Sequence, residues 1–546
     1  MNLIPTARKC ACLRAAGALA LTLIAGCATT AHQPPNPLAE AAQSERTAGG
    51  LEKKNPAKAI GLYLSVAEKA FAIASDKTAA PAAREQALAI YNAALAHSVA
   101  AMQKQAGGVL TGSTQVFSAA GKTYLVRVAP ARGESRVNPG AFDRVIAASE
   151  ISKKQLGCDV QRDGMGGQLI GVLKADGKRA NCPPAGFAEP LTAIAEFGRP
   201  DHTGKTPVTL SFYNPQNADQ VTVGSSRFPL AGDFSAPLAY YPQRNEILIG
   251  IAAMLRSDRV VARTGIYFYE PYDPNKIPVL FVHGLMSSPH VWLHFINELN
   301  KNPDFRKRYQ AWVFLYPSGA PIVASAVRLR RALAELAVRY PLRNNMVMVG
   351  HSMGGILTKM QVSNSRDDLW RGIFGRNAEK VSAQFPADSP IREALFFKAN
   401  PHIARVIFIA TPHLGSRLAT LRIAGIVGSL IRLPAKVVSA VDPKVLKSVL
   451  RGIDPSFRSP PTSIAGLSPK SPLLQSVRKL PPTVPYHSII GNRGRINEAL
   501  ADSSDGFVPY WSSHLPEANS EIIVPTGHDA FNHPDSVAEV LRILAL

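Results

Sequence analysis

The chain has 546 residues, of which 46% are hydrophobic and 18% are charged. This length predicts several domains with ample buried core, and the apolar content excludes disorder over most of the chain. After the first thirty residues no apolar run approaches the roughly 20 residues of a membrane-spanning helix, which excludes a membrane bundle. The net charge of +22 comes from scattered Lys and Arg without a basic block interleaved with aromatic residues, so nucleic acid is not a predicted partner.

The first segment has the pattern of a targeting signal. Basic residues precede a short apolar stretch at 15–25, and the stretch ends in Leu-Ile-Ala-Gly-Cys27, which is similar to the bacterial lipobox. That resemblance implies cleavage before Cys27 and attachment of lipid to this cysteine; the alternative is an ordinary cleaved signal. We expect a signal peptide at 1–26 and a Pro-containing tether at 27–50. The protein would then be lipid-anchored in a bacterial cell envelope, and Ala28, which is not the Asp of inner-membrane retention, favours the outer membrane.

Cysteine usage suggests a cross-link in the mature body. Two cysteines leave with the signal and Cys27 takes the lipid, so that Cys158 and Cys182 remain. In an oxidising compartment these two could form a disulfide, which is the predicted state; two unpaired thiols are the alternative.

The region before residue 273 is predicted to contain two parts. Residues 51–108 are Ala-rich, with apolar residues at helical spacing, which predicts a helical hairpin. Residues 109–272 contain short β-rich stretches between Gly, Pro and Asp turns, which predict a small β-rich domain such as a sandwich. Neither part carries a motif that indicates a function, and a protein partner for them cannot be named.

From residue 273 to 546 strands and helices alternate. The apolar run PVLFVHG at 278–284 is typical of a buried parallel strand, and further strand and helix patterns follow it to a terminal helix at the chain end. Repeated βα units predict an α/β domain with a mostly parallel sheet covered on both faces. Its active groups are expected at the carboxyl ends of the strands.

Residues 350–354, with the sequence GHSMG, fit the G-x-S-x-G pattern of a nucleophile elbow. A serine on a sharp strand-to-helix turn needs small residues on both sides, because the backbone folds back on itself. An apolar strand precedes this motif and a helical pattern follows it. Ser352 is therefore the predicted nucleophile, and its neighbour His351 is predicted to be structural.

A second motif, His283-Gly284, ends the first strand of this half. Backbone N–H groups at such a turn can stabilise a developing oxyanion. The predicted donors are Leu285 and Met353, the residue after the nucleophile, and His283 is expected to brace the loop.

An acid and a base should follow the serine in that order. Asp505 lies in the polar turn SSDGFVP after a strand and is the predicted acid, with Asp502 as its competitor. His528 closes the last strand in VPTGH and is the predicted base, with His533 as its main rival and His514 in a loop. Both alternatives stay open on the sequence.

Together these motifs resemble the α/β-hydrolase superfamily, close to bacterial lipases and to lipase-like hydrolases related to GPI inositol-deacylases. The resemblance rests on VHGLMSSP, GHSMGG, ATPHLGS, SDGFVPY and VPTGH, and covers about half of the chain. It implies a serine hydrolase that cleaves carboxylic esters through Ser352, Asp505 and His528.

The hydrophobic and basic residues between about 417 and 475 predict a cap over an acyl groove, with an ordinary crossover as the alternative. A cationic, lipid-anchored enzyme would lie near anionic membrane, which favours a lipid-like ester as substrate. Acyl transfer or thioester hydrolysis by the same triad, and a non-catalytic envelope scaffold, remain alternatives. No metal cluster or cofactor motif stands out in the sequence, so a chelator is expected to leave activity intact.

Overall fold

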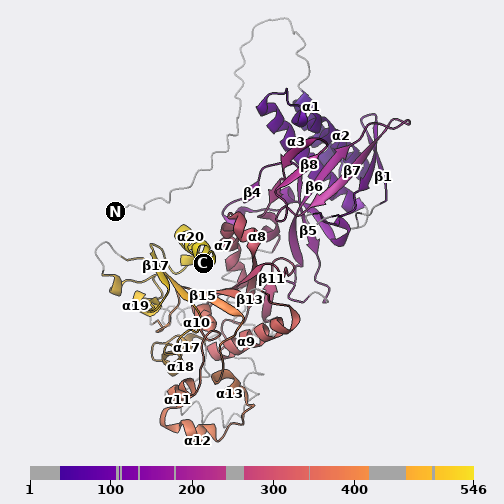
Figure 1. Ribbon diagram of the computed structural model, residues 1–546. Coiled ribbons are helices and arrows are strands. Elements are labelled where there is room, and N and C mark those ends of the chain that lie inside the picture. Colours follow the sequence, from indigo (N-terminus) through magenta and orange to yellow (C-terminus); the bar gives the residue numbers. More distant parts are fainter. Residues whose placement is uncertain are drawn as a thin grey trace.

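The structure is a computed structural model that describes residues 37–105, 110, 113–132, 136–177, 180–241, 263–343, 345–416, 463–494 and 499–546. The signal peptide, Cys27 and residues 417–462 of the expected cap lie outside the described residues. Figure 1 shows two bodies, an amino-terminal domain and a carboxy-terminal domain. Among the described helices none is long and apolar enough to cross a membrane.

The amino-terminal domain begins with three helices, α1 (Pro37–Leu51), α2 (Pro56–Ser75) and α3 (Pro81–Gln105). The Asn55 side chain caps α2 by accepting a hydrogen bond from the Lys58 amide. The predicted helices are confirmed as α2 and α3. The predicted tether is wrong for residues 37–50, which belong to α1 instead. Buried Leu and Ala side chains of α1 pack into the same core as α2, which explains why this stretch is helical.

Six strands of this domain form one mixed sheet in the order β1-β2-β7-β6-β5-β3. Their bounds are β1 (Gln115–Ala119), β2 (Lys122–Val128), β3 (Arg144–Ala147), β5 (Gly167–Leu173), β6 (Phe187–Phe197) and β7 (Lys205–Tyr213). Short pairs, β4 (Gln161–Arg162) with β10 (Gly232–Asp233) and β8 (Gln220–Val223) with β9 (Ser226–Pro229), and the helix α4 (Ala236–Ala239) complete it.

The helices and this sheet share one hydrophobic core, so the two predicted parts are one domain rather than a hairpin beside a sandwich. Tyr91 on α3 is fully buried, and its hydroxyl contacts both the carbonyl and the amide of Ala195 on β6. A Cβ added to Gly167 on β5 would lie 2.6 Å from the Ala96 nitrogen of α3. The sheet therefore takes helices on one face, because the Ala-rich helices approach its strands closely (Figure 1).

The carboxy-terminal domain is built on a seven-stranded sheet in the order β11-β13-β12-β14-β15-β16-β17. The strands are β11 (Gly265–Phe268), β12 (Ile277–Val282), β13 (Tyr309–Leu315), β14 (Met346–His351), β15 (Ile403–Ile409), β16 (Tyr486–Gly491) and β17 (Ser520–Val524). Every neighbouring pair is parallel except β11 with β13. The predicted mostly parallel sheet is confirmed. Residues 265–268, predicted within the β-rich domain, are instead its edge strand.

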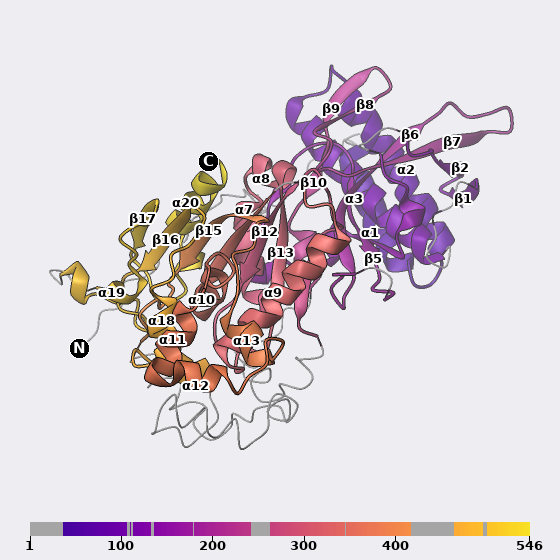
Figure 2. The same ribbon diagram turned by 60° about the horizontal axis from the view of Figure 1, so that its bottom comes forward.

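Helices cover both faces of this sheet (Figure 2). On one face α9 (Ile322–Arg339) and α10 (Met353–Lys359) bury their apolar sides, and on the other face α7 (Trp292–Leu299) and α20 (Pro534–Leu544) do so. The remaining helices are α8 (Pro303–Arg308), α11 (Asp368–Phe374), α12 (Ala378–Ser382), α13 (Pro390–Leu395), α17 (Ser463–Gly466), α18 (Pro472–Val477) and α19 (Tyr510–Ser513). The insertion α11–α13 between α10 and β15 was not predicted, and α18, at the end of the expected cap, packs against α11.

Candidate active site

Ser352 stands on a strained turn between β14 and α10. Its backbone has φ +53° and ψ −126°, a conformation that residues other than Gly rarely adopt. A Cβ on Gly354 would lie 2.2 Å from the Val282 carbonyl oxygen, and one on Gly355 would lie 1.9 Å from Thr411 Oγ1. The glycines of the motif are therefore required because β12 and β15 approach the turn. This packing holds the serine at the carboxyl end of the sheet.

The structure brings Ser352, His528 and Asp505 together, although they lie far apart in the chain. His528 Nε2 is 2.9 Å from Ser352 Oγ, and His528 Nδ1 is 2.7 Å from Asp505 Oδ2. The serine follows β14, and the histidine lies in the loop after β17. The aspartate comes from the long connection between β16 and β17. Parallel strands place all three loops at one edge of the sheet, which explains how distant residues meet.

The environment of Asp505 fixes its carboxylate. Oδ1 accepts hydrogen bonds from the backbone amides of Phe507 and Val508, each at 2.7 Å, and only Oδ2 is left for His528. Asp505 is 1% exposed, while the side chain of His528 is 21% exposed. The tight turn SDGFVP supplies these amides. A buried, doubly held carboxylate can orient the imidazole and stabilise its charged form.

The competing residues have other contacts. Asp502 is exposed on a short turn of 3₁₀ helix. The His533 ring caps α20 by accepting from the Asp535 amide. His514 contacts Glu521 and Tyr510. The structure therefore places Asp505 and His528, rather than their competitors, beside Ser352.

The predicted oxyanion donors lie on two sides of the serine. Met353 is the first residue of α10, and the first amides of a helix have no acceptor within it. Gly284 approaches so closely that an added Cβ would lie 3.0 Å from Ser352 Cβ, which puts the Leu285 loop against the nucleophile. The two segments that carry the predicted donors therefore lie next to Ser352.

Two buried histidines near the site act as neutral braces. Burial lowers the pKa of His351 to about 3, and its Nε2 lies 2.8 Å from the His528 carbonyl oxygen. Burial also lowers the pKa of His283 to about 4, and its ring stacks on Tyr316 at 4.3 Å. Both rings stay uncharged near neutral pH, and both hold backbone close to the site. This agrees with their prediction as structural residues.

Phe507 is a site residue that sequence reasoning missed. Its ring lies 5.2 Å from the His528 ring, and its backbone amide donates to Asp505. The signal was present in the turn SDGFVP, where an aromatic residue follows the acid by two positions. The turn motif alone did not show which way this ring points.

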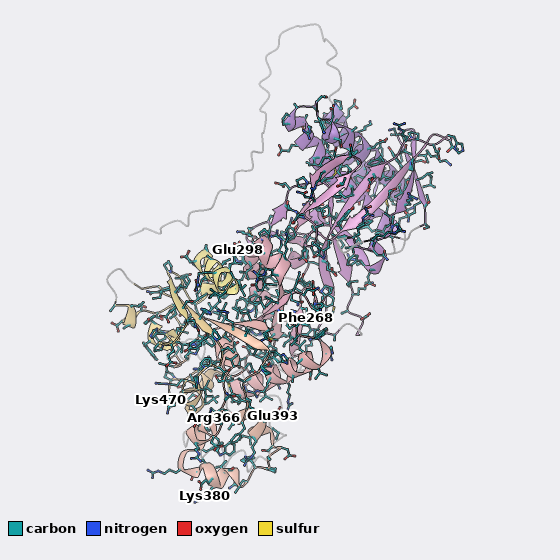
Figure 3. The ribbon with its side chains drawn as sticks, in the orientation of Figure 1. Phe268, Glu298, Arg366, Lys380, Glu393 and Lys470 are labelled. Atoms are coloured by element: carbon teal, nitrogen blue, oxygen red, sulfur yellow. The ribbon has the colours of Figure 1, made fainter. Side chains whose placement is uncertain are left out.

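The predicted disulfide is wrong, since Cys158 and Cys182 are both thiols. Cys158 Sγ donates to Glu298 Oε1 at 3.0 Å, and Cys182 packs in a core of the carboxy-terminal domain. Figure 3 labels Glu298 on the side of that domain that meets the amino-terminal domain. The two sulfurs therefore lie in different surroundings. Their separation in sequence is short enough for a disulfide, but the fold does not place them next to each other. Within the described residues no group of His, Cys, Asp and Glu could hold a metal ion.

Comparison with known proteins agrees with this architecture. Residues 279–540 match the sequence model of the alpha/beta hydrolase family. The carboxy-terminal half is an α/β-hydrolase domain. No curated protein sequence matches the chain.

Two solved structures each match about half of the chain at low identity. The lipase BlEst2 of Bacillus licheniformis in its mature form is 20% identical, covering 51% of this chain and 97% of that chain with a TM-score of 0.29. Lipase 1 of Pelosinus fermentans is 14% identical, covering 49% and 98% with a TM-score of 0.29. These similarities do not bear on the substrate.

Proposed function

We propose that the protein is a serine hydrolase that cleaves carboxylic esters through Ser352, His528 and Asp505. The observation that carries this proposal is the unbroken series of hydrogen bonds from Asp505 through His528 to the Ser352 hydroxyl. A buried serine on a strained turn has no structural need for such a series. The family of the hydrolase domain is consistent with this chemistry.

The geometry allows each step. His528 Nε2 takes the proton of the Ser352 hydroxyl, and Oγ attacks the ester carbonyl carbon. The negative charge that develops on the carbonyl oxygen is met by the Leu285 and Met353 N–H groups. His528 then returns the proton to the leaving alcohol, which leaves an acyl group on Ser352. The same imidazole deprotonates a water molecule that attacks the acyl carbon. The bond from this carbon to Ser352 Oγ breaks, His528 returns the proton to Oγ, and the carboxylic acid leaves.

The test uses the full-length protein beside Ser352→Ala and a control, Ser365→Ala. Ser365 is a fully buried serine whose hydroxyl accepts a hydrogen bond from the backbone amide of Phe397, and it lies outside the site. Each is exposed to a fluorescent fluorophosphonate and to p-nitrophenyl esters of rising acyl length. Labelling and turnover in the wild type and in Ser365→Ala, with loss in Ser352→Ala, are expected. Folded wild type that reacts with neither reagent, with or without lipid vesicles, would refute a serine hydrolase.

A lipid-like ester is the proposed substrate, and a bacterial cell envelope is the proposed location. The support is the lipobox-like segment ending at Cys27 together with the basic charge. This net charge is +22 for the whole chain and +19 once residues 1–26 are removed, and it would hold the enzyme near anionic lipid. Cys27→Ala is expected to abolish incorporation of an alkyne-tagged fatty acid and to release the protein from membranes. Incorporation that persists in this variant would overturn the anchor. A preference for short acyl chains in the ester series would overturn the lipid-like substrate.

A further inference from the structure

The loop that carries Leu285 contains an unfavourable backbone conformation. Met286, the next residue, has φ +56°, in the left-handed region that side-chain-bearing residues seldom occupy. Such a conformation persists only where its surroundings enforce it. The contacts that enforce it here therefore also determine the loop geometry next to Ser352.

Two peptide groups on either side of Leu285 are held by separate side chains. The Met286 amide donates to Ser318 Oγ at 3.2 Å. His283 Nδ1 lies 2.9 Å from the Gly284 carbonyl oxygen, which belongs to the same peptide group as the Leu285 N–H. One bond sets the plane before the Leu285 Cα and the other sets the plane after it. The His283 contact orients the peptide that carries the Leu285 N–H, and the Ser318 contact anchors the chain on the other side of Leu285, so that this peptide is held from both ends.

Ser318 is well placed for this contact. It is fully buried and follows β13, which pairs in parallel with β12, the strand from which the Leu285 loop leaves. Two residues earlier, the Tyr316 hydroxyl donates to the His283 carbonyl oxygen at 2.6 Å, and its ring stacks on the His283 ring. The segment after β13 thus supports the loop after β12 at two successive points. Ser318 itself contacts a backbone amide rather than the triad.

We propose that Ser318 is a positioning residue, which aims the Leu285 N–H at the oxyanion through its hydrogen bond to Met286. This inference rests on the proposed function, because the Leu285 amide matters only if an oxyanion forms there. The hydrogen bond to the Ser318 hydroxyl offsets part of the energetic cost of the left-handed backbone conformation at Met286. Its loss would free the chain after Leu285. The Gly284–Leu285 peptide would then be anchored from one side only and could shift away from the transition state, while the groups that bind the ground state stay in place.

Ser318→Ala tests this role beside Ser365→Ala, which loses an equally buried hydroxyl elsewhere in the domain. We expect kcat to fall between about tenfold and a hundredfold in Ser318→Ala with KM changed less than about twofold, because a misaligned donor weakens transition-state binding alone. The inhibition constant of an alkyl boronic acid, whose tetrahedral adduct places an oxygen at the oxyanion site, should rise by a similar factor. A merely structural role would not raise it. Ser365→Ala should retain wild-type kcat and boronate affinity.

A second variant keeps the test decisive if Ser318→Ala is poorly folded. Ser318→Cys is close in size and supplies a weaker acceptor, so kcat and boronate affinity intermediate between wild type and Ser318→Ala are expected. Wild-type kcat and boronate affinity in a folded Ser318 variant, in an assay where Ser352→Ala is inactive, would overturn this inference and leave the proposed function standing. Inactivity of the wild type itself would instead refute the proposed function.

Discussion

Two buried aspartates, one in each domain, are held in the same way but face different partners. Asp233 in the amino-terminal domain accepts from the backbone amides of Ser235 and Ala236 through one oxygen, just as Asp505 accepts from two amides in the hydrolase domain. Each side chain is 1% exposed. The other oxygen of Asp233 meets Lys153 Nζ at 2.7 Å, whereas that of Asp505 meets His528 at 2.7 Å.

The difference lies in what the second oxygen can do to its partner. A lysine ammonium is a permanent charge near neutral pH, so the Asp233 pair can only hold the fold. An imidazole can accept a proton from a neighbouring hydroxyl and return it, so the same kind of carboxylate can orient a base and stabilise its charged form. Burial of a carboxylate and its two amide donors therefore does not indicate catalysis. The titratable partner and the serine hydroxyl beyond it do.

The neighbourhood of Asp233 supports this structural interpretation. Ser235 Oγ donates to Asn297 Oδ1 at 2.8 Å, and Asn297 donates to the Cys158 carbonyl oxygen at 3.0 Å. Asn297 lies on α7 of the hydrolase domain and is fully buried. A continuous polar network therefore joins the two domains.

The strongest test of these separate roles replaces each aspartate by asparagine, which changes one carboxylate oxygen to an amide nitrogen. Asp505→Asn is expected to lower kcat by about 10⁴-fold with little change in stability, because the imidazole loses its orienting charge. Asp233→Asn is expected to keep kcat within about twofold and to lower the free energy of unfolding by about 1–2 kcal/mol, because Lys153 loses its buried charged partner but keeps the more exposed Asp159. Steady-state kinetics and urea unfolding of both variants would check this. A large kcat loss in Asp233→Asn would contradict the assignment of separate roles.

The unfolding free energy should depend on pH in opposite directions for a buried glutamate of the amino-terminal domain and a buried histidine of the hydrolase domain. Desolvation, together with nearby Glu270, raises the pKa of Glu189 on β6 to about 7 from an ordinary 4.5, so the folded state binds more protons than the unfolded state between these values. Stability from this group is lost as pH rises from 4.5 to 7. Burial lowers the pKa of His283 to about 4 from 6.5, so its contribution is lost as pH falls from 6.5 to 4.

Two variants isolate these opposite slopes. In the wild type, Glu189 makes the unfolding free energy fall as pH rises, and His283 makes it rise. Glu189→Gln and His283→Asn should each abolish the corresponding contribution, which is at most about 1.4 kcal/mol per pH unit. Urea unfolding at several pH values between 4 and 7.5 measures both. Equal slopes in wild type and both variants would show that neither group titrates differently on folding.

The smallest expected effect concerns the thiols at and near the domain junction. Dithiothreitol should leave the melting temperature unchanged within about 1 °C, since no disulfide joins Cys158 to Cys182. Burial and the Glu298 contact raise the pKa of Cys158 to about 11. Alkylation by iodoacetamide at pH 8 should therefore be roughly two orders of magnitude slower than for a free cysteine. A Cys158–Cys182 peptide in a non-reducing digest would contradict the structure.

Motifs with strict local requirements were predictable from sequence. The elbow around Ser352 needs glycines because its turn packs against two neighbouring strands. The buried strands of the parallel sheet can be identified from their own apolar residues, without knowing which strands pair with them. Asp505 was favoured because it lies in a polar turn after a strand, and His528 because it directly follows the last strand, but Asp502 and His533 stayed open. Only their contacts in the structure place the first two beside the serine.

Longer-range relations were not predictable. The expected disulfide failed because sequence separation allows a cross-link but does not place two sulfurs together. Residues 265–268 were assigned to the wrong domain, since an edge strand has the same local pattern in either sheet. The helices before residue 106 and the strands after it were separated, although one core joins them, because a helix-on-sheet contact leaves no periodic signal that spans both.

The sequence by itself determined the parallel strands of the carboxy-terminal half, the elbow at Ser352 and the short set of residues from which an acid and a base could come. These depend on local backbone chemistry and on hydrophobic periodicity, which are written within a few residues of each position. The tertiary structure alone decided which aspartate faces the histidine, that Ser318 supports the Leu285 loop, and that the two cysteines stay apart. Each of these depends on side chains from different loops meeting in space, and sheet pairing rather than sequence distance determines which loops meet.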